Sequence, residues 1–291
     1  MLKENDHIGT PVKPYMVVFF SANLLNSFLS CRKTEDFIKV SENERNWVVS
    51  GNVFAYTDTC LRQGRTDFEE RREKKFPYYG ILPLILTLTA NFIAYFGTRP
   101  FTSSWKHYNI ETVLDQQIPV IPWTIVIYFG CYLVWIVNYL IAASREKEFV
   151  WRFFAADVLA RLVCMAFYLL LPTTNVRPSI PEQGFWNQML ALLYQMDAAD
   201  NLFPSIHCLN SWFCYIAVRS RREIPRWYQR FSFWAALAVF VSTLTTKQHV
   251  IADVIGGALL AEVTWQIAGR THLGAWYGMI LERRRWKRRA E

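Results

Sequence analysis

The sequence predicts an all-α, polytopic membrane protein built on a bundle of six transmembrane helices. Hydrophobic residues make up 52% of its 291 residues, aromatic residues 16% and charged residues 19%, which is low in charge for a soluble protein. Trp and Tyr residues stand near several segment ends, as at membrane interfaces. Crossing a bilayer takes roughly 20 apolar residues, and six segments reach or approach this length: 78–96, 121–142, 153–171, 205–218, 231–246 and 249–268.

The chain divides into three parts by composition. Residues 1–77 are mixed in charge and poorly periodic, which predicts a cytoplasmic or interfacial segment. Within them, the stretch 15–29 is apolar but short, so a signal sequence, a seventh span and lipidation near Cys31 are alternatives. Residues 78–270 are the expected six-helix membrane core, and residues 271–291 are a basic cytoplasmic tail.

Individual spans carry features that bear on their packing. The fourth segment is the weakest, because its uninterrupted apolar part is short. The third segment carries Asp157 and Arg161 four residues apart, which predicts an ion pair that faces the bundle, since charges are costly in lipid. The sixth segment carries Gly256 and Gly257, and small residues of this kind let helices approach closely in a membrane.

Positive charge is distributed unevenly along the chain, and this predicts the orientation. Short cytoplasmic connections of membrane proteins are rich in Lys and Arg. Alternate connections and the C-terminal part hold 18 basic residues, at Arg71, Arg72, Lys74, Lys75, Arg145, Lys147, Arg152, Arg219, Arg221, Arg222, Arg226, Arg230, Arg283, Arg284, Arg285, Lys287, Arg288 and Arg289. The other connections hold 4, at Arg99, Lys106, Arg177 and Lys247. We therefore expect the basic connections and the C-terminus in the cytoplasm.

Composition also bears on partners and cofactors. The net charge of +8 is spread over membrane-flanking connections, which indicates a bilayer surface rather than nucleic acid. The six cysteines form no Cys-x-x-Cys pair, so we expect no disulfide framework and no zinc site. No motif in the chain suggests a cofactor.

Two short patches bring histidines to the starts of apolar segments. The first patch, 203–207, ends in Pro204-Ser205-Ile206-His207, and proline suits the first turn of a helix, whose free amides favour an anion. In the second patch, His249 and Asp253 are four residues apart and would share one helix face. A carboxylate there fixes one imidazole tautomer, as a nucleophilic or general-base histidine requires.

Two cations lie on the same predicted side of the membrane as the histidines. Arg177 follows the third span and Lys247 precedes His249, and both belong to the connections with few basic residues. Two histidines, one carboxylate, two cations and a helix N-terminus are the parts of a site for a phosphate ester. A metal site is the rival use of these side chains, but the two cations would repel a divalent ion.

The order of these motifs resembles the type 2 phosphatidate phosphatase superfamily. The pattern is Arg177-Pro178, then Pro204-Ser205-x-His207, then His249-x3-Asp253, within residues 78–270. Its members include lipid phosphatases, vanadium haloperoxidases, and the sphingomyelin and inositol phosphorylceramide synthases. The resemblance implies a metal-independent mechanism in which His249 is the nucleophile, Asp253 orients it, His207 protonates the leaving oxygen, and Arg177 and Ser205 hold phosphate oxygens.

Some positions depart from the hydrolase pattern of this superfamily. Leu170 stands where the pattern has a lysine, Ser242 and Thr243 stand where it has Ser-Arg, and Ile206 replaces a glycine. Two phosphate-binding cations are therefore missing, and Lys247 is the expected replacement for one of them. The altered pattern is closest to the inositol phosphorylceramide synthase-like, phosphotransferase branch.

These observations predict a membrane enzyme that cleaves a lipid phosphate ester on the non-cytoplasmic leaflet through a phosphohistidine. The acceptor is water, as in a phosphatidate phosphatase, or a second hydroxyl, as in a head-group transferase. A transporter or scramblase-like bundle and a family member that binds lipid without turnover are the alternatives. Midplane charges and broken helices would favour the transporter, whereas both histidines are expected at the mouth of the bundle.

Overall fold

The computed structural model describes residues 77–181 and 183–290 of the chain, with side chains as far as residue 282. The alternatives for 15–29 and Cys31, and the segment predicted over 1–77 apart from its last residue, lie outside these residues. The described helices are α4 (Tyr78–Phe92), α5 (Arg99–Thr102), α6 (Val113–Gln117), α7 (Ile125–Ala143), α8 (Lys147–Leu170), α9 (Phe185–Met196), α10 (Ile206–Val218), α11 (Arg226–Thr245), α12 (Ile251–Arg270) and α13 (Leu273–Ala290).

The prediction of a mostly helical membrane protein is confirmed, whereas the prediction of six spans is not. Four helical segments of the described chain are long and apolar enough to cross a bilayer: Tyr78–Thr102, Pro122–Ala143, Lys147–Leu170 and Ile251–Arg270. Helix α10 is apolar but has 13 residues, fewer than the roughly 20 that a bilayer requires. Helix α11 has 20 residues but is not among the sufficiently apolar helices. Six spans are therefore not established by length and composition.

The connections contain more structure than the sequence predicted. The first span continues through a π-helical turn, Ile93–Gly97, into α5, and α6 and α9 are short helices in connections that had no predicted elements. Two-residue strands β1 (Tyr108–Asn109) and β2 (Thr173–Thr174) pair in parallel, a small departure from an all-α fold. The expected basic tail is largely a helix, α13.

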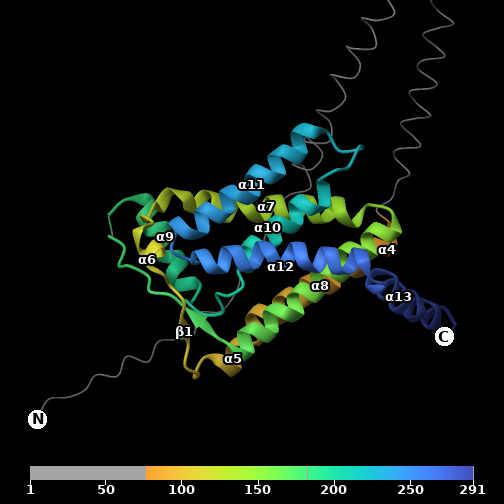
Figure 1. Cartoon of the computed structure of the whole chain (residues 1–291), viewed down its shortest axis with the longest axis horizontal. Helices are drawn as coiled ribbons and strands as arrows, with labels where there is room; N and C mark the ends of the chain where they lie inside the picture. The colour runs from red at the N-terminus through yellow and green to blue at the C-terminus, as the bar shows by residue number, and fades with distance from the viewer. Residues whose placement is uncertain (1–76, 182, 291) are drawn as a thin grey trace, which may run out of the picture. The chain divides into compact units, whose positions relative to one another are not determined.

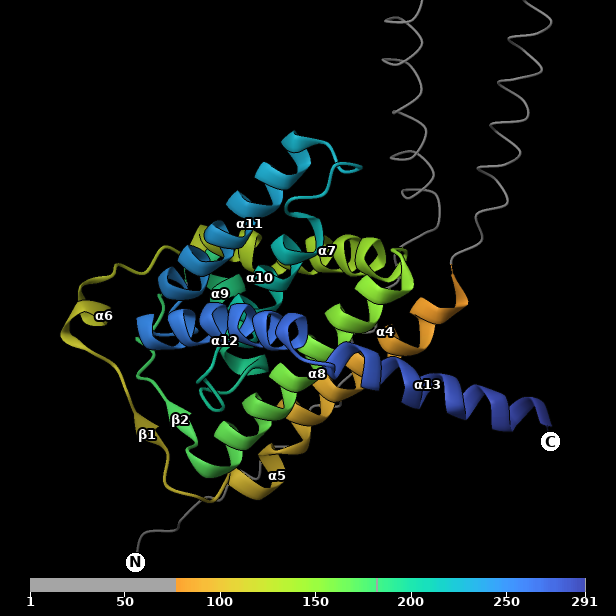
Figure 2. The same cartoon turned by 45° about the vertical axis from the view of Figure 1, so that its right-hand side comes forward.

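Two central helices organise the bundle. Helix α8 packs against α4, α12 and α13, and α10 packs against α7, α11 and α12. Figure 1 shows α12 between α10 and α8, and the turned view shows α4 running beside α8 (Figure 2). Helix α12 thus contacts both central helices, so its position decides how the two halves of the bundle meet.

The predicted ion pair inside the third span is present and fully enclosed. The Nη2 atom of Arg161 lies 2.7 Å from Oδ1 of Asp157, and both side chains are buried. Asn210 and Tyr139 also accept hydrogen bonds from this guanidinium, and Thr87 donates one to the Asp157 carboxylate at 2.6 Å. Because unpaired charges are expensive in lipid, these contacts stabilise a pair that joins α4, α7, α8 and α10.

The two ends of the bundle differ in their side chains. At one end, Arg145 pairs with Glu223 at 2.5 Å, which ties the α7–α8 and α10–α11 connections together, and Arg219 pairs with Glu262 of α12 at 2.8 Å. The other end carries α6, α9 and both histidine patches. In Figure 1, α6 and α9 lie at the left-hand end and α13 leaves at the right.

Candidate active site

The turn before α12 presents His249. The amides of Gln248 and His249 both donate to the carbonyl oxygen of Thr243, at 3.0 and 3.1 Å, so the chain folds back on the end of α11. The Asp253 carboxylate then accepts from the Val250 amide at 2.9 Å and contacts Nδ1 of His249 at 3.3 Å. The helix begins after His249, so the two side chains meet across its first turn rather than along one helix face. Asp253 is fully buried and His249 is 8% exposed.

Helix α10 presents His207 to the same place. Ser205 is its N-cap, with Oγ accepting from the Cys208 amide at 3.3 Å, a usual role for serine at this position. The amide of Ser205 donates to the carbonyl oxygen of Asp253 at 3.1 Å, which joins the two patches directly. The ring centroids of His207 and His249 are 5.8 Å apart. Both imidazoles can therefore contact one small group held between them.

Aromatic rings from α7 surround His207. The Tyr128 ring lies 4.5 Å and the Trp135 ring 5.4 Å from the imidazole, measured between ring centroids. The hydroxyl of Tyr132 is 3.5 Å from Nε2 of His207, at the limit of a hydrogen bond. These rings restrict His207 to one orientation, with its imidazole close to His249.

Gly257 allows α10 and α12 to cross closely behind the histidines. A Cβ atom at this position would lie 2.4 Å from the carbonyl oxygen of Ser205 and 3.1 Å from the amide nitrogen of Leu209. Both are backbone atoms, so a larger residue cannot be accommodated by rotating a side chain. At Gly256, the neighbouring atoms belong to the ring of Phe203 instead.

A narrow cavity lies between the two histidines and the segment that precedes α10. Its volume is about 10 Å³, on the scale of a single water molecule. Five separated parts of the described chain line the cavity. The lining residues are Tyr95, Tyr168, Asp197, Asp200, Asn201, Leu202, Ile206, His207, Gln248 and His249. A phosphate group needs more room, so side chains at its edge must move when one binds.

The predicted phosphate-binding residues lie at different distances from this cavity. Arg177 donates to the carbonyl oxygen of Asp197 and, at 2.8 Å, to Oε1 of Gln248, beside His249. Ser205 is fully buried at the start of α10 and is not among the cavity-lining residues. Lys247 points elsewhere, because its Nζ atom donates to the carbonyl oxygen of Asp115 at 2.6 Å.

Several cavity residues were not singled out from the sequence. Tyr95 comes from the π-helical turn of the first span, and such wider turns are frequent at functional sites. Asp197 and Asp200 follow α9, and both pair with Arg99, a residue that the sequence marks only as one of the few cations of the outer connections. Gln248 lines the cavity with a buried Nε2 that has no partner among the described residues, so it is a free hydrogen-bond donor.

Helix α6 fixes the first turn of α12. The Asp115 carboxylate accepts a hydrogen bond from the Ile251 amide at 2.7 Å, and another from the Thr112 amide at 2.8 Å. Burial raises the pKa of Asp115, but the hydrogen bond from the Thr112 hydroxyl, the two amide donors and nearby Lys247 together outweigh burial and hold the pKa below its usual value of 3.8. The carboxylate therefore stays ionised at neutral pH and caps the helix that follows His249.

Within residues 77–181 and 183–290, no cluster of three or more His, Cys, Asp or Glu side chains could hold a metal ion. The cysteines of this part, at 131, 164, 208 and 214, are buried and form no disulfide.

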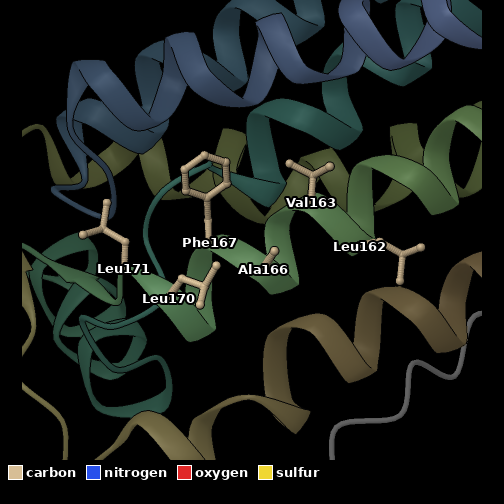
Figure 3. A pocket seen from close by; sticks show the side chains of 6 residues that line it. All are labelled: Leu162, Val163, Ala166, Phe167, Leu170 and Leu171. Atoms are coloured by element: carbon tan, nitrogen blue, oxygen red, sulfur yellow. The ribbon is translucent and has the colours of Figure 1, made fainter.

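An apolar groove of about 330 Å³ lies on α8, close to the cavity. Figure 3 shows its lining, which comes from Leu162, Val163, Ala166, Phe167, Leu170 and Leu171. The Phe167 ring packs edge-on against Phe203, with 5.1 Å between centroids. The next residue, Tyr168, lines the cavity and donates to the carbonyl oxygen of Pro204 at 2.7 Å. Adjacent residues of α8 therefore face the groove and the cavity.

Comparison with known proteins identifies the family. The model of the PAP2 superfamily matches residues 104–267, more than half of the chain, and this range includes both histidine patches and Arg177. No curated protein and no solved structure matched the chain. Members of this superfamily are phosphoesterases and phosphotransferases, so the match supports an enzyme of phosphoric ester chemistry. The chain belongs to the PAP2 superfamily of membrane-associated helical proteins.

Proposed function

We propose that this protein transfers the phosphoryl unit, or phosphate head group, of a membrane lipid through a phosphohistidine on His249. The observation that carries the proposal is the meeting of His207 and His249 at one cavity, with Asp253 in contact with His249. Because Nδ1 of His249 contacts Asp253 at 3.3 Å, the other ring nitrogen, Nε2, is the one available to attack phosphorus. The carboxylate also stabilises the positive charge that the ring acquires on attack.

The reaction has two steps in this proposal. Nε2 of His249 forms a bond to phosphorus as the bond from phosphorus to the ester oxygen breaks, and His207 gives its proton to that leaving oxygen. Water or an alcohol then attacks the phosphohistidine, His207 takes the proton of the attacking hydroxyl, and the nitrogen–phosphorus bond breaks. Arg177 and Gln248 are placed to hold phosphate oxygens, since both lie beside His249.

The apolar groove on α8 supports a lipid as the substrate. Leu170 is 82% exposed in this groove, and it occupies the position at which the hydrolase pattern carries a lysine. This end of α8 therefore offers hydrocarbon contacts where a phosphatase would offer a charge. That change favours the phosphotransferase branch, with a second hydroxyl compound as acceptor.

Product analysis tests this chemistry. We expect purified protein to release the alcohol part of a long-chain lipid phosphate and to transfer the phosphorus-containing part to an added hydroxyl acceptor. His249→Ala should abolish turnover and should prevent trapping of an acid-labile, alkali-stable phosphoprotein. His272→Ala, an exposed histidine before α13, is the matched control and should behave as wild type. Full turnover by His249→Ala would contradict the mechanism.

We also propose that the site opens on the non-cytoplasmic side. The candidate catalytic residues lie at the end of the bundle opposite the Arg145 and Arg219 ion pairs, and basic connections favour the cytoplasm. In a background without native cysteines, Ile180→Cys should react with an impermeant maleimide in sealed cells. Glu223→Cys should react only after permeabilisation, and the reverse pattern would place the chemistry in the cytoplasm.

A further inference from the structure

Arg99 lies at the edge of the cavity and forms ion pairs with two carboxylates. Arg99 donates from Nη2 to Asp197 at 2.9 Å and from Nε to Asp200 at 2.8 Å. The same Nη2 donates to the hydroxyl of Tyr95 at 2.8 Å, and Tyr95 donates to Asp197. Tyr95 and both aspartates line the cavity that also contains His249. The Arg99 guanidinium is thus one hydrogen bond away from the place where the phosphate must bind.

This arrangement does not suit a bound phosphate. Two carboxylates line a cavity that is to hold a dianion, and like charges at such short range repel strongly where water is scarce. The cavity volume of about 10 Å³ also leaves no space for a phosphate group. The Arg99, Asp197 and Asp200 side chains are each 18–20% exposed, so this cluster reaches the edge of the protein rather than its core. It is the wall of the cavity best placed to move.

The site also has fewer cations than the hydrolase pattern of the superfamily provides. Leu170 and Thr243 stand where the hydrolase pattern has a lysine and an arginine, and Lys247 is directed to the carbonyl oxygen of Asp115. Arg177 is the other described arginine near His249, and it already donates to the Asp197 carbonyl oxygen. A phosphate bound at His249 therefore needs a further positive group.

We propose that Arg99 is a phosphate-binding residue, and that the substrate phosphate replaces the Asp197 carboxylate as its partner. This inference rests on the proposed function. A guanidinium binds carboxylate and phosphate oxygens through the same N–H donors, so the Asp197 oxygen at Nη2 of Arg99 occupies the position that a phosphate oxygen takes. The exchange enlarges the cavity and moves a negative charge away from it. Arg99 would then supply one of the two missing cations.

Vanadate, a phosphate mimic, tests the exchange by direct calorimetric titration of the full-length protein. Arg99→Gln should weaken vanadate binding by about 10-fold or more, since a hydrogen bond to a charged group is worth at least this factor. Asp197→Asn should bind vanadate as tightly as wild type or several-fold more tightly, because a competing charge is lost. Arg219→Gln, which removes a comparable ion pair with Glu262 at the other end, is the matched control and should leave binding unchanged.

The outcomes separate this inference from the proposed function. If Arg99→Gln binds vanadate within twofold of the wild-type affinity, the inference is wrong. Turnover of a lipid phosphate would in that case leave the proposed function intact. Equal weakening in Arg99→Gln and Asp197→Asn also overturns it, because the pair would then be structural. If Arg99→Gln does not fold, Asp197→Asn alone still tests the inference. Weaker vanadate binding by this variant than by wild type would show that phosphate does not replace Asp197 at Arg99. A wild type that neither binds vanadate nor cleaves a lipid phosphate overturns both proposals.

Discussion

The crossing of α10 and α12 at Gly257 should set the distance between the two histidines. In Gly257→Ala, the added Cβ atom would lie 2.4 Å from the carbonyl oxygen of Ser205, whereas ordinary contacts begin at 3.4 Å. The backbones must therefore separate by about 1 Å, and overpacking of this kind costs about 1–3 kcal/mol of stability. A shift of 1 Å at a catalytic geometry reduces rate by about 100-fold. We expect a fall in kcat of this size, measured with a lipid phosphate in detergent micelles.

A second glycine provides the control. Gly130 lies on α7, and a Cβ atom there would meet nothing within 4 Å. Gly130→Ala should keep wild-type turnover and gain stability of about 0.5–1 kcal/mol, because alanine loses less backbone entropy in a helix. The stability of both variants is measured by thermal unfolding, monitored by circular dichroism. Wild-type kcat in folded Gly257→Ala would refute the argument that this contact holds the two histidines in register.

Three further predictions concern the residues around His249. Asp253→Asn should lower kcat by orders of magnitude, because His249 loses the carboxylate that fixes its tautomer. Circular dichroism should show an unchanged fold, and a near-normal kcat would contradict the orienting role of Asp253. Asp115→Ala should cost about 1 kcal/mol through loss of the cap on the Ile251 amide. Since the folded-state pKa of Asp115 is lowered, this contribution is complete above its usual pKa near 3.8 and disappears as pH falls through the folded value, so the two proteins' unfolding midpoints should converge in acid. Activity should survive EDTA, and a loss that Mg²⁺ or Zn²⁺ restores would refute a metal-independent mechanism.

Short-range features of the site could be predicted from the sequence. The spacing of His249 and Asp253 places them within one helical turn, and the structure gives a 3.3 Å contact even though α12 begins two residues later. The Asp157–Arg161 pair follows from the same spacing. Lys247 shows the limit of such reasoning, since its φ of 53° turns the chain in a left-handed conformation and directs the side chain to Asp115.

Long-range contacts and marginal helices could not be predicted. Arg99 and Asp197 are 98 residues apart, and no pattern in either segment indicates that they meet. Helix α9 lies in a connection for which the sequence predicts no helix, because 12 residues are too few for a strong periodic signal. The expected fourth and fifth spans, 205–218 and 231–246, correspond to helices at the right places, but composition and length do not establish that they cross the membrane.

The hydrogen bond from the Ser205 amide to the Asp253 carbonyl oxygen has a consequence for inactivation. It links the residue that begins α10 to the residue that orients His249, so fraying at the start of either helix breaks the same bond. Loss of activity on heating should therefore be a single sharp event, with no partly active state in which one histidine is still in place. The Ser205 amide should exchange its hydrogen with solvent at the same rate as activity is lost.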